Sequence, residues 1–359
     1  MLGNKERKSR VLTEMQDTNS KVMTKYKIAY VELDTHAEIA LSFKTLMEAS
    51  NRVEVDYFFS NKIKKLLGKN TPNIIEANPN TILKLLSAKE YDLVVVGTVH
   101  RYFNIFDKVV KNYKTAIICH NLNFIKASNT DLLKVLLKED TVYRIKLLLK
   151  EGLMLKNSVY QNSVSRWVLS EELAPSKYQH IPLFYTEYQQ EFSNNKGLTL
   201  VIPGIVSQKR RDYKAVVESL SSQYFNEPTE VVFLGKAMGE ELDWLKSLEQ
   251  KNLNNLKLTY FTEKVPQELF DEYLLKASLI WAPIQQKTHF FNITEYYGKT
   301  KVSGNNGDAM KYGKKIVFSK NIEEVLSYQN IREVERTSKQ KALEITENLI
   351  ESAINAKKH

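Results

Sequence analysis

The chain has 359 residues, 43% of them hydrophobic and 26% charged, and a formal net charge of +10 at pH 7. This length exceeds one typical folding core and predicts two domains. The longest apolar runs, such as 93–96 and 279–282, are far shorter than the roughly 20 residues of a membrane-spanning helix. The positive charge predicts attraction to phosphate groups, but it does not choose among nucleotides, lipids and nucleic acid.

The amino-terminal segment, residues 1–22, is polar and shows no periodicity. We expect it to be disordered or to have been added for expression, and its lack of an apolar stretch argues against a secretory signal. Cys119 is the single cysteine, so no internal disulfide can form. These features predict a cytoplasmic protein.

Residues 23–192 are predicted to form an α/β domain in which strands and helices alternate. Apolar, β-branched runs predict strands, and apolar residues at helical spacing predict helices. Nearly continuous apolar strands are typical of parallel sheets covered on both faces, so a doubly wound sheet is expected. The expected strands are 26–33, 53–59, 92–99 and 115–119, and the expected helices are 35–49, 81–88 and 106–112.

The stretch 131–155 combines leucines and valines at helical spacing with several basic residues. The simpler interpretation is a helix whose apolar face packs on the core and whose polar face meets water. The alternative is attachment to an anionic membrane surface, helped by a second basic group at Lys62, Lys64, Lys65 and Lys69.

Residues 193–335 repeat the alternation and are predicted to form a second α/β domain. The periodicity weakens before Asn194–Gly197, which indicates a linker at the boundary. A last helix is expected within 336–359, with Ala342, Ile345, Leu349 and Ala353 on one face, packed across the domain junction. The expected strands are 198–203, 230–235, 256–261, 278–282 and 315–318, and the expected helices are 212–221, 240–250 and 268–275.

The segment 296–319 contains a polar, glycine-rich loop, a short helix that ends at Tyr312, and a buried strand. Glycines allow a close approach of backbone to a ligand, and the amino end of a helix favours an anion. The pattern therefore predicts a phosphate site. A solvated turn before a surface helix is the plain alternative.

Ligands of open parallel sheets bind beyond the carboxyl ends of the strands. In the first half these ends carry polar residues at 32–36, 100–101 and 120–121. In the second half they carry Gly204 with a basic run at 209–211, Gly235, and the turn 263–266.

The chain from about Met23 to His359, with two α/β domains, resembles the GT-B glycosyltransferases. The best evidence lies in the second half, where several segments occur in the order of that family. IPGIVSQKRRDYKAVVESL at 202–220 is similar to the opening strand, glycine loop and basic helix start, and VVFLGKA, KVP at 264–266 and ASLIWAP follow. GDAMKYGKKIVF at 307–318 is similar to the segment that holds the nucleotide. The resemblance implies two Rossmann-like domains that face each other across a cleft. It places a nucleoside-diphosphate sugar in the second domain and an acceptor in the first.

The resemblance also implies roles for particular residues. Lys209 with Arg210 or Arg211 would neutralise the departing diphosphate, and Asp308 would accept hydrogen bonds from ribose hydroxyls. The plain alternative for the basic residues is a solvated helix start. For Asp308 it is an acidic residue that complements a helix dipole. The full predicted nucleotide and diphosphate set is Gly204, Lys209, Arg210, Arg211, Val265, Lys299, Lys301, Ser303, Gly304, Asn305, Asn306, Gly307 and Asp308.

The candidate catalytic residues are His120, Glu295 and His36. His120 follows a strand where family members place a polar group near the donor sugar, although it could equally be a satisfied core histidine. The paired glutamates of many retaining members are absent here, and Glu295 is the nearest carboxylate upstream of Asp308. It could contact the sugar only if the intervening loop folds differently, and the alternative is a carboxylate of a surface loop. His36 could act as a general base on the acceptor hydroxyl.

No metal-ligand cluster, P-loop or dinucleotide fingerprint is visible in the sequence, so we expect no cofactor and a transfer that is independent of metal. The predicted function is transfer of a hexosyl group from a UDP- or GDP-type sugar to a glycan or lipid-linked acceptor, as in polysaccharide biosynthesis. Attachment to the inner face of a membrane stays open, and no nucleic acid is expected. The alternatives are a sugar-nucleotide epimerase and a non-catalytic nucleotide-sugar-binding or membrane-surface scaffold.

Overall fold

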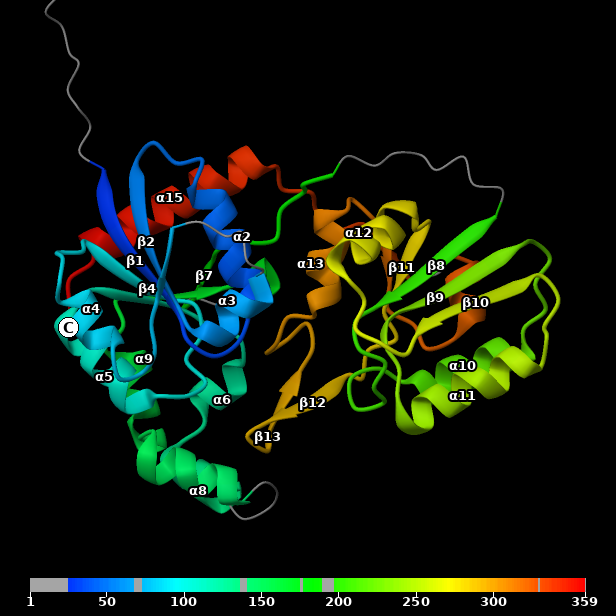
Figure 1. Ribbon diagram of the computed structural model, residues 1–359, viewed down its shortest axis with the longest axis horizontal. Helices are drawn as coiled ribbons and strands as arrows, with labels where there is room; N and C mark the ends of the chain where they lie inside the picture. The colour runs from blue at the N-terminus through cyan, green and yellow to red at the C-terminus, as the bar shows by residue number, and fades with distance from the viewer. Residues whose placement is uncertain are drawn as a thin grey trace, which may run out of the picture.

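The computed structural model describes residues 25–67, 73–135, 141–174, 177–188, 197–328 and 330–358. Figure 1 shows two lobes, each built around its own sheet. The predictions for the leader 1–22, for Lys69 and for the linker residues 194–196 lie outside the described residues.

The first domain contains a seven-stranded parallel sheet in the order β3-β2-β1-β4-β5-β6-β7. Apolar clusters lie on both faces of this sheet, which explains why its central strands read as continuous apolar runs. The sequence did not predict three short strands, β3, β6 and β7, because two to four residues carry little periodicity. The strands are β1 (Tyr26–Glu32), β2 (Val53–Phe59), β3 (Ile74–Glu76), β4 (Leu93–Val96), β5 (Thr115–Ile118), β6 (Ser165–Val168) and β7 (Gln179–His180).

Helices cover both faces of the first sheet, because the strand order changes direction between β3 and β4 while the crossovers stay right-handed. Helix α2 packs through Phe43 in the cluster that also contains Trp167, whereas α5 packs on the opposite face through Phe103 and Phe106. The helices are α2 (Ala37–Met47), α3 (Asn61–Leu67), α4 (Ile82–Leu86), α5 (Phe103–Asn112), α6 (Leu122–Lys126), α7 (Asn129–Val135), α8 (Thr141–Lys150) and α9 (Lys156–Gln161), with short 3₁₀ turns at Leu153–Leu155 and Glu171–Leu173.

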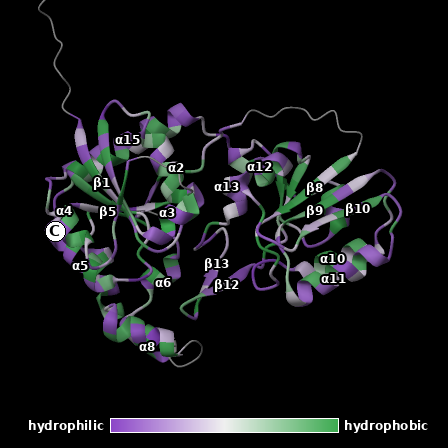
Figure 2. Cartoon of the chain, in the orientation of Figure 1, coloured by the Kyte–Doolittle hydropathy of each residue, from purple (hydrophilic) through white to green (hydrophobic). Residues whose placement is uncertain are grey.

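The second domain contains a six-stranded sheet in the order β10-β9-β8-β11-β14-β15, in which only the edge strand β15 runs antiparallel. Figure 2 shows hydrophobic residues concentrated on the strands of both sheets. The strands are β8 (Leu198–Pro203), β9 (Thr229–Lys236), β10 (Leu256–Phe261), β11 (Leu279–Trp281), β14 (Ile316–Val317) and β15 (Ile331–Arg332), and the helices are α10 (Tyr213–Ser222), α11 (Gly239–Gln250), α12 (Gln267–Lys276), α13 (Gly304–Lys311) and α14 (Ile322–Leu326).

An antiparallel hairpin, β12 (Lys287–Phe290) and β13 (Ile293–Tyr296), lies between β11 and α13 in the chain. Its turn residues, Phe291 and Asn292, both have positive φ angles, as two-residue hairpin turns require. The side chains of Phe290, Phe291 and Ile293 pack against the core of the first domain. The hairpin therefore connects the two lobes, and the sequence did not predict it.

The last helix, α15 (Lys339–Asn355), lies on the first domain. Ala342, Ile350 and Ala353 are buried in the same cluster as α2. The carboxylate of Glu347 accepts a 2.6 Å hydrogen bond from the Ser50 hydroxyl. The chain thus ends on the domain where it began, as Figure 1 shows.

Within 131–155 the structure describes parts of α7, all of α8 and a 3₁₀ turn, and residues 136–140 lie outside the described residues. The expectation that the apolar residues face the core needs correction at α8. Helix α8 buries Arg144 and Leu147 but exposes Val142, at 85%, and Leu149, at 76%. The apolar spacing correctly indicated a helix but not which of its faces is covered. Across the described ranges, no helix is both long enough and apolar enough to cross a membrane.

Candidate active site

The carboxyl end of β8 is the first part of the site. Gly204 follows this strand with a φ of 101°, and a Cβ there would lie 2.8 Å from Nη2 of Arg211. A Cβ on Gly235 would lie 2.3 Å from the carbonyl oxygen of Gly204. Both positions therefore require glycine, and the tight loop brings the Arg211 guanidinium against the end of the sheet.

The guanidinium of Arg211 contacts the amino end of α13. Ser303 caps the helix by accepting a hydrogen bond from the Asn305 amide. The Asn305 Oδ1 accepts from Arg211 Nη2 at 3.0 Å, while its Nδ2 donates to the Pro203 carbonyl at 3.1 Å and to Asp308 Oδ2 at 3.4 Å. Because Asn305 is buried, it holds both charged partners in place. We call Arg211, Asn305 and Asp308 the arginine–aspartate cluster.

Burial raises the pKa of Asp308 to about 6. The hydrogen bond from Asn305 and the positive charges of Arg211 and Lys311 oppose this rise. The carboxylate is therefore mostly ionised at neutral pH and becomes protonated in mild acid. An ionised carboxylate next to a guanidinium can accept hydroxyl hydrogen bonds while the guanidinium binds an anion.

Three histidines at the strand ends of the first domain form the second part of the site. The rings of His36 and His120 stack, with centroids 3.9 Å apart and planes at 7°. The ring of His100 lies 5.7 Å from each of them, at 69°. His36 has a φ of 59° at the start of α2, and this left-handed conformation directs the chain from β1 into the helix. We call these residues the histidine cluster.

Hydrogen bonds assign the ring protons of the buried histidines. The Nε2 of His120 lies 2.8 Å from the Gly97 carbonyl, so it carries the proton and leaves Nδ1 with a lone pair. Lys301 Nζ donates to Asn121 Oδ1 at 2.9 Å, which orients the amide so that its Nδ2 donates to His100 Nε2 at 3.0 Å. Burial, followed by the charge of His36, lowers the pKa of both His100 and His120, so both are neutral at pH 7.

A buried carboxyl group lies beneath the histidine cluster. Glu32 Oε2 accepts from the Thr98 hydroxyl at 2.7 Å, and Oε1 accepts from the amides of Asp34 and Thr35. Burial raises the pKa of Glu32 to about 8, so this group is mostly protonated at neutral pH. A Cβ on Gly97 would lie 2.7 Å from Glu32 Oε2, which leaves no room for another residue there.

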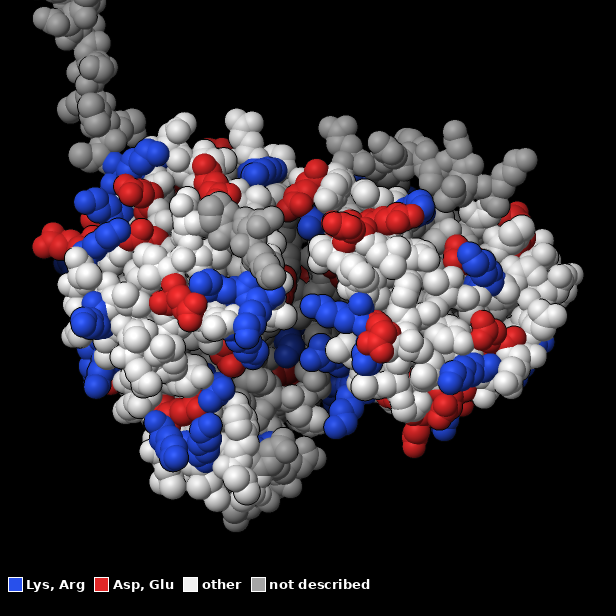
Figure 3. All heavy atoms as spheres, viewed as in Figure 1, with Lys and Arg blue, Asp and Glu red and all other residues white. Residues whose placement is uncertain are grey.

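The two clusters face one groove. Figure 3 shows this groove between the lobes, with basic side chains on both of its sides. Glu38, at the start of α2, contributes to the raised pKa of Asp308, and the charge of Arg210 contributes to the lowered pKa of Lys301. Lys301 in turn helps to lower the pKa of both His100 and His120. Charges from both domains therefore act on the same space.

Glu295 does not lie in the groove, so its predicted placement near the sugar needs correction. It is fully buried, and its oxygens accept hydrogen bonds from the backbone amides of Asn123, at 3.2 Å, and Phe124, at 2.7 Å. It therefore caps α6 of the first domain from the hairpin of the second. The carbonyls at the other end of α6 accept from the buried ammonium group of Lys156.

The structure separates the other predicted residues into two groups. Ser303, Asn305 and Gly307 are buried at the start of α13, where Gly307 packs against the ring of Phe184. The Oδ1 of Asn306 is buried there without a hydrogen-bond partner among the described residues. Exposed positions are Lys209, Arg210, Lys299 and Gly304, whereas Val265 is half-buried against the second core.

Sequence reasoning missed the residues that link these groups. Thr98 follows β4 in the structure but fell inside the strand predicted at 92–99, whereas Asn121 was a candidate only by its position after a predicted strand. Their partners, Glu32 and Lys301, are distant in the chain, so no local motif could show the contacts. Within the described ranges, no group of three or more histidine, cysteine, aspartate or glutamate residues is arranged to hold a metal ion.

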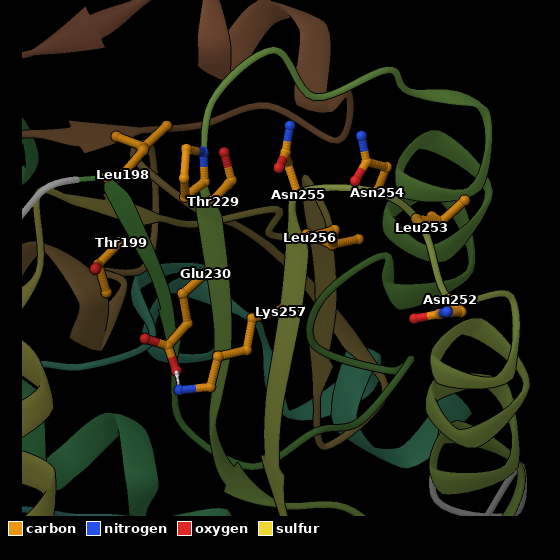
Figure 4. A pocket seen from close by; sticks show the side chains of 12 residues that line it. Leu198, Thr199, Thr229, Glu230, Asn252, Leu253, Asn254, Asn255, Leu256 and Lys257 are labelled. Atoms are coloured by element: carbon orange, nitrogen blue, oxygen red, sulfur yellow. Dashed lines mark ion pairs between the residues drawn. The ribbon is translucent and has the colours of Figure 1, made fainter.

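A surface hollow of about 690 Å³ lies elsewhere, at the amino ends of β8, β9 and β10. Figure 4 shows its lining, in which Glu230 pairs with Lys257 at 2.9 Å. Ligands of parallel sheets bind at the opposite edge, where the two clusters lie. We therefore place the candidate site in the groove.

No protein-family model and no curated protein matches the sequence. The architecture does match solved structures. The apo form of the lipopolysaccharide outer core galactosyltransferase WaaB aligns over 91% of this chain and 99% of its own, with a TM-score of 0.54 and 10% identity. The chain has a GT-B fold.

Two further structures support this fold. Sucrose-phosphate synthase from Thermosynechococcus elongatus aligns over 92% of this chain and 96% of its own, with a TM-score of 0.52 and 12% identity. The N-terminal domain of Candida albicans trehalose-6-phosphate phosphatase aligns over 95% of this chain and 92% of its own, with a TM-score of 0.52 and 9% identity. The predicted pair of Rossmann-like domains is thus confirmed. Proteins with different names share the GT-B fold, so the function must be argued from the site.

Proposed function

We propose that this chain transfers a hexosyl group from a nucleoside-diphosphate sugar to a glycan or lipid-linked acceptor. The observation that supports it is the meeting of two different clusters at one groove. The arginine–aspartate cluster has the chemistry to bind a nucleotide diphosphate, and the histidine cluster has the chemistry to accept a proton.

The proposed donor half of the reaction uses the second domain. Arg211, Arg210 and Lys301 stabilise the negative charge that develops on the diphosphate as the glycosidic bond breaks. The amides at the start of α13 add fixed dipoles directed at the same anion. The two oxygens of Asp308 accept hydrogen bonds from the vicinal hydroxyls of a ribose.

The proposed acceptor half uses the first domain. In a neutral His36 ring, Nδ1, which lies 3.0 Å from Glu38 Oε1, carries the proton and Nε2 keeps a lone pair. Nδ1 of His120 also keeps its lone pair, because its Nε2 donates to Gly97. Either nitrogen could receive the proton of an acceptor hydroxyl within hydrogen-bond distance. We propose His36 and His120 as the candidates, with transfer independent of metal.

A thermal-shift screen with UDP, GDP and their sugars tests donor binding. A ligand that binds only the folded state raises the apparent melting temperature. We expect a rise with at least one diphosphate, reduced in Asp308→Ala and in Arg210→Ala. If both variants bind uridine and guanosine diphosphates as well as the parent does, the site assignment is wrong.

Product analysis then tests the reaction. Incubation of a binding nucleotide sugar with glycan or lipid-linked acceptors should release the nucleoside diphosphate and form a glycosylated product. An altered sugar nucleotide formed without any acceptor would indicate epimerisation instead. Binding without any turnover would favour a scaffold, and loss of activity with a chelator would contradict metal independence.

A further inference from the structure

The exposed face of α8 has an unusual composition for a helix in contact with water. Val142 is 85% exposed and Leu149 is 76% exposed, and Ile145, at 39%, lies between them at helical spacing. Exposed apolar residues are ordinary when single, but a row along one helix indicates a surface that binds something. Helix α8 also lies at the end of its lobe, away from both sheets, as Figure 1 shows.

Basic residues accompany this apolar row. Lys146 and Lys150 are exposed on the same helix, and no ion pair within the described part of the chain involves either of them. Figure 3 shows basic side chains at the end of the lobe where Figure 1 places α8. Apolar residues flanked by lysines match an interface that is apolar inside and anionic at its surface.

The helix is held to the domain by its other face, so it can present this row as a fixed surface. Arg144 and Leu147 are buried, and the backbone of Lys150 accepts a hydrogen bond from the Asn104 side chain. Glu151, directly after the helix, is buried and forms an ion pair with the partly exposed Arg101. A segment without such anchoring would not keep its apolar side chains in water.

Helix α8 is also connected to the edge of the groove. The guanidinium of Arg101 lies 5.9 Å from the ring centroid of Tyr143 and 3.6 Å from Asp34. Asp34 in turn pairs with Lys62 at 3.4 Å. Since Asp34 and Arg101 are close in sequence to His36 and His100, a surface seated on α8 would lie near the groove.

We propose that the exposed face of α8, formed by Val142, Ile145, Lys146, Leu149 and Lys150, docks on an anionic lipid bilayer. The apolar side chains enter the boundary between headgroups and acyl chains, and the two lysines remain among the anionic headgroups. The proposal concerns binding to the bilayer surface and does not depend on sugar transfer.

Sedimentation with vesicles tests the proposal on the full chain. We use vesicles of pure phosphatidylcholine and vesicles with 30% phosphatidylserine, at low and at high salt. We expect retention by the anionic vesicles at low salt and a marked loss at high salt, because salt screens the lysines. Equal binding to both vesicle types, or no binding to either, would overturn the proposal.

Variants locate the contact. Val142→Ser with Leu149→Ser should lower the vesicle partition coefficient about ten-fold or more, and Lys146→Glu with Lys150→Glu should lower it by at least about five-fold per lysine. The matched controls are Tyr224→Ser, an exposed aromatic residue of the second domain, and Lys246→Glu with Lys251→Glu on and beside α11. If the controls lose as much binding as the α8 variants, the contact is not at α8.

Two further measurements test whether the variants are misfolded and whether the chain associates with itself. Circular dichroism and thermal melting should match between the variants and the parent, because the changed side chains are exposed. Light scattering in the absence of lipid should give the same mass for parent and serine variant. A parent dimer that the Val142→Ser, Leu149→Ser variant abolishes would assign the face to a second copy of the chain and contradict the proposal.

Discussion

The two clusters that face the groove are built in different ways. The arginine–aspartate cluster comes from a loop and a helix start, where capping, a tight glycine turn and one buried amide orient the charges. The histidine cluster comes from three separate strand ends and is held by stacked rings and by a carboxyl group that burial keeps protonated. The difference indicates that the first cluster suits a charged ligand and the second suits a proton.

The largest expected effect comes from breaking the contact that joins the two lobes. Glu295→Ala leaves the buried amide of Phe124 and the partly buried amide of Asn123 without acceptors, and each such loss costs about 1–3 kcal/mol. We expect the free energy of unfolding to fall by about 3 kcal/mol, measured by urea denaturation. Glu295→Gln keeps one acceptor oxygen, so it should lower the free energy of unfolding by less than Glu295→Ala does. An alanine variant as stable as the parent would contradict the capping role.

The second effect tests whether the arginine–aspartate cluster binds the charged ligand. Arg211→Ala removes charge-assisted hydrogen bonds, so the Kd for the preferred nucleoside diphosphate should rise about 10- to 100-fold. Lys214→Ala is the matched control at the start of α10, because Lys214 is exposed and lies outside the predicted diphosphate set, and it should change the Kd by less than about three-fold. Calorimetric titration measures both. Equal effects of the two variants would show that the diphosphate is attracted by positive charge in general and does not bind specifically at the arginine–aspartate cluster.

The third effect tests the protonated carboxyl group under the histidine cluster. Because the folded-state pKa of Glu32 is raised to about 8, its contribution to stability is complete below the unfolded pKa and is lost as the pH rises through 8. Between these values the parent should lose about 1.4 kcal/mol per pH unit relative to Glu32→Gln. Urea denaturation of both proteins at pH 6 and at pH 7 measures this difference of about 1.4 kcal/mol. Parallel pH profiles would show that Glu32 is ionised in the folded protein.

The smallest effect concerns the pH dependence of the nucleotide site. The pKa of Asp308 is about 6, so its carboxylate loses its charge below that pH and accepts hydroxyl hydrogen bonds poorly. We expect nucleoside affinity to fall several-fold between pH 7 and pH 5. In Asp308→Asn the affinity should be lower at pH 7 and should lack this step. The same pH step in both proteins would assign the titration to the phosphate or to another residue.

The sequence predicted the parts of this molecule that depend on local signals. Buried parallel strands gave continuous apolar runs, and the first turns of α13 with the residue before them carried the glycines, the capping serine and Asp308 within a few residues. Both Rossmann-like domains could therefore be expected before the structure. The residues of the arginine–aspartate cluster could be named, although their mutual hydrogen bonds could not.

The remaining features depend on contacts between distant parts of the chain. Glu295 looked like a catalytic carboxylate because it lies upstream of Asp308, yet the hairpin turns it away to cap α6, 171 residues earlier in the chain at Phe124. The stacking of His36 on His120 joins the ends of two strands that are not adjacent in the sheet. Helix α8 had the right period for a helix, but only its packing shows which face is exposed. Apolar periodicity in the sequence predicts a helix or strand, but tertiary contacts determine which of its faces is buried.

The central claim is that one ligand occupies the groove between the two clusters. The most direct measurement is a crystal structure of the chain with the nucleoside diphosphate that stabilises it most. The account predicts a diphosphate within hydrogen-bond distance of Arg211 and Lys301, with ribose hydroxyls on Asp308. A nucleotide seated in the hollow at the amino ends of β8, β9 and β10, with the groove empty, would contradict it.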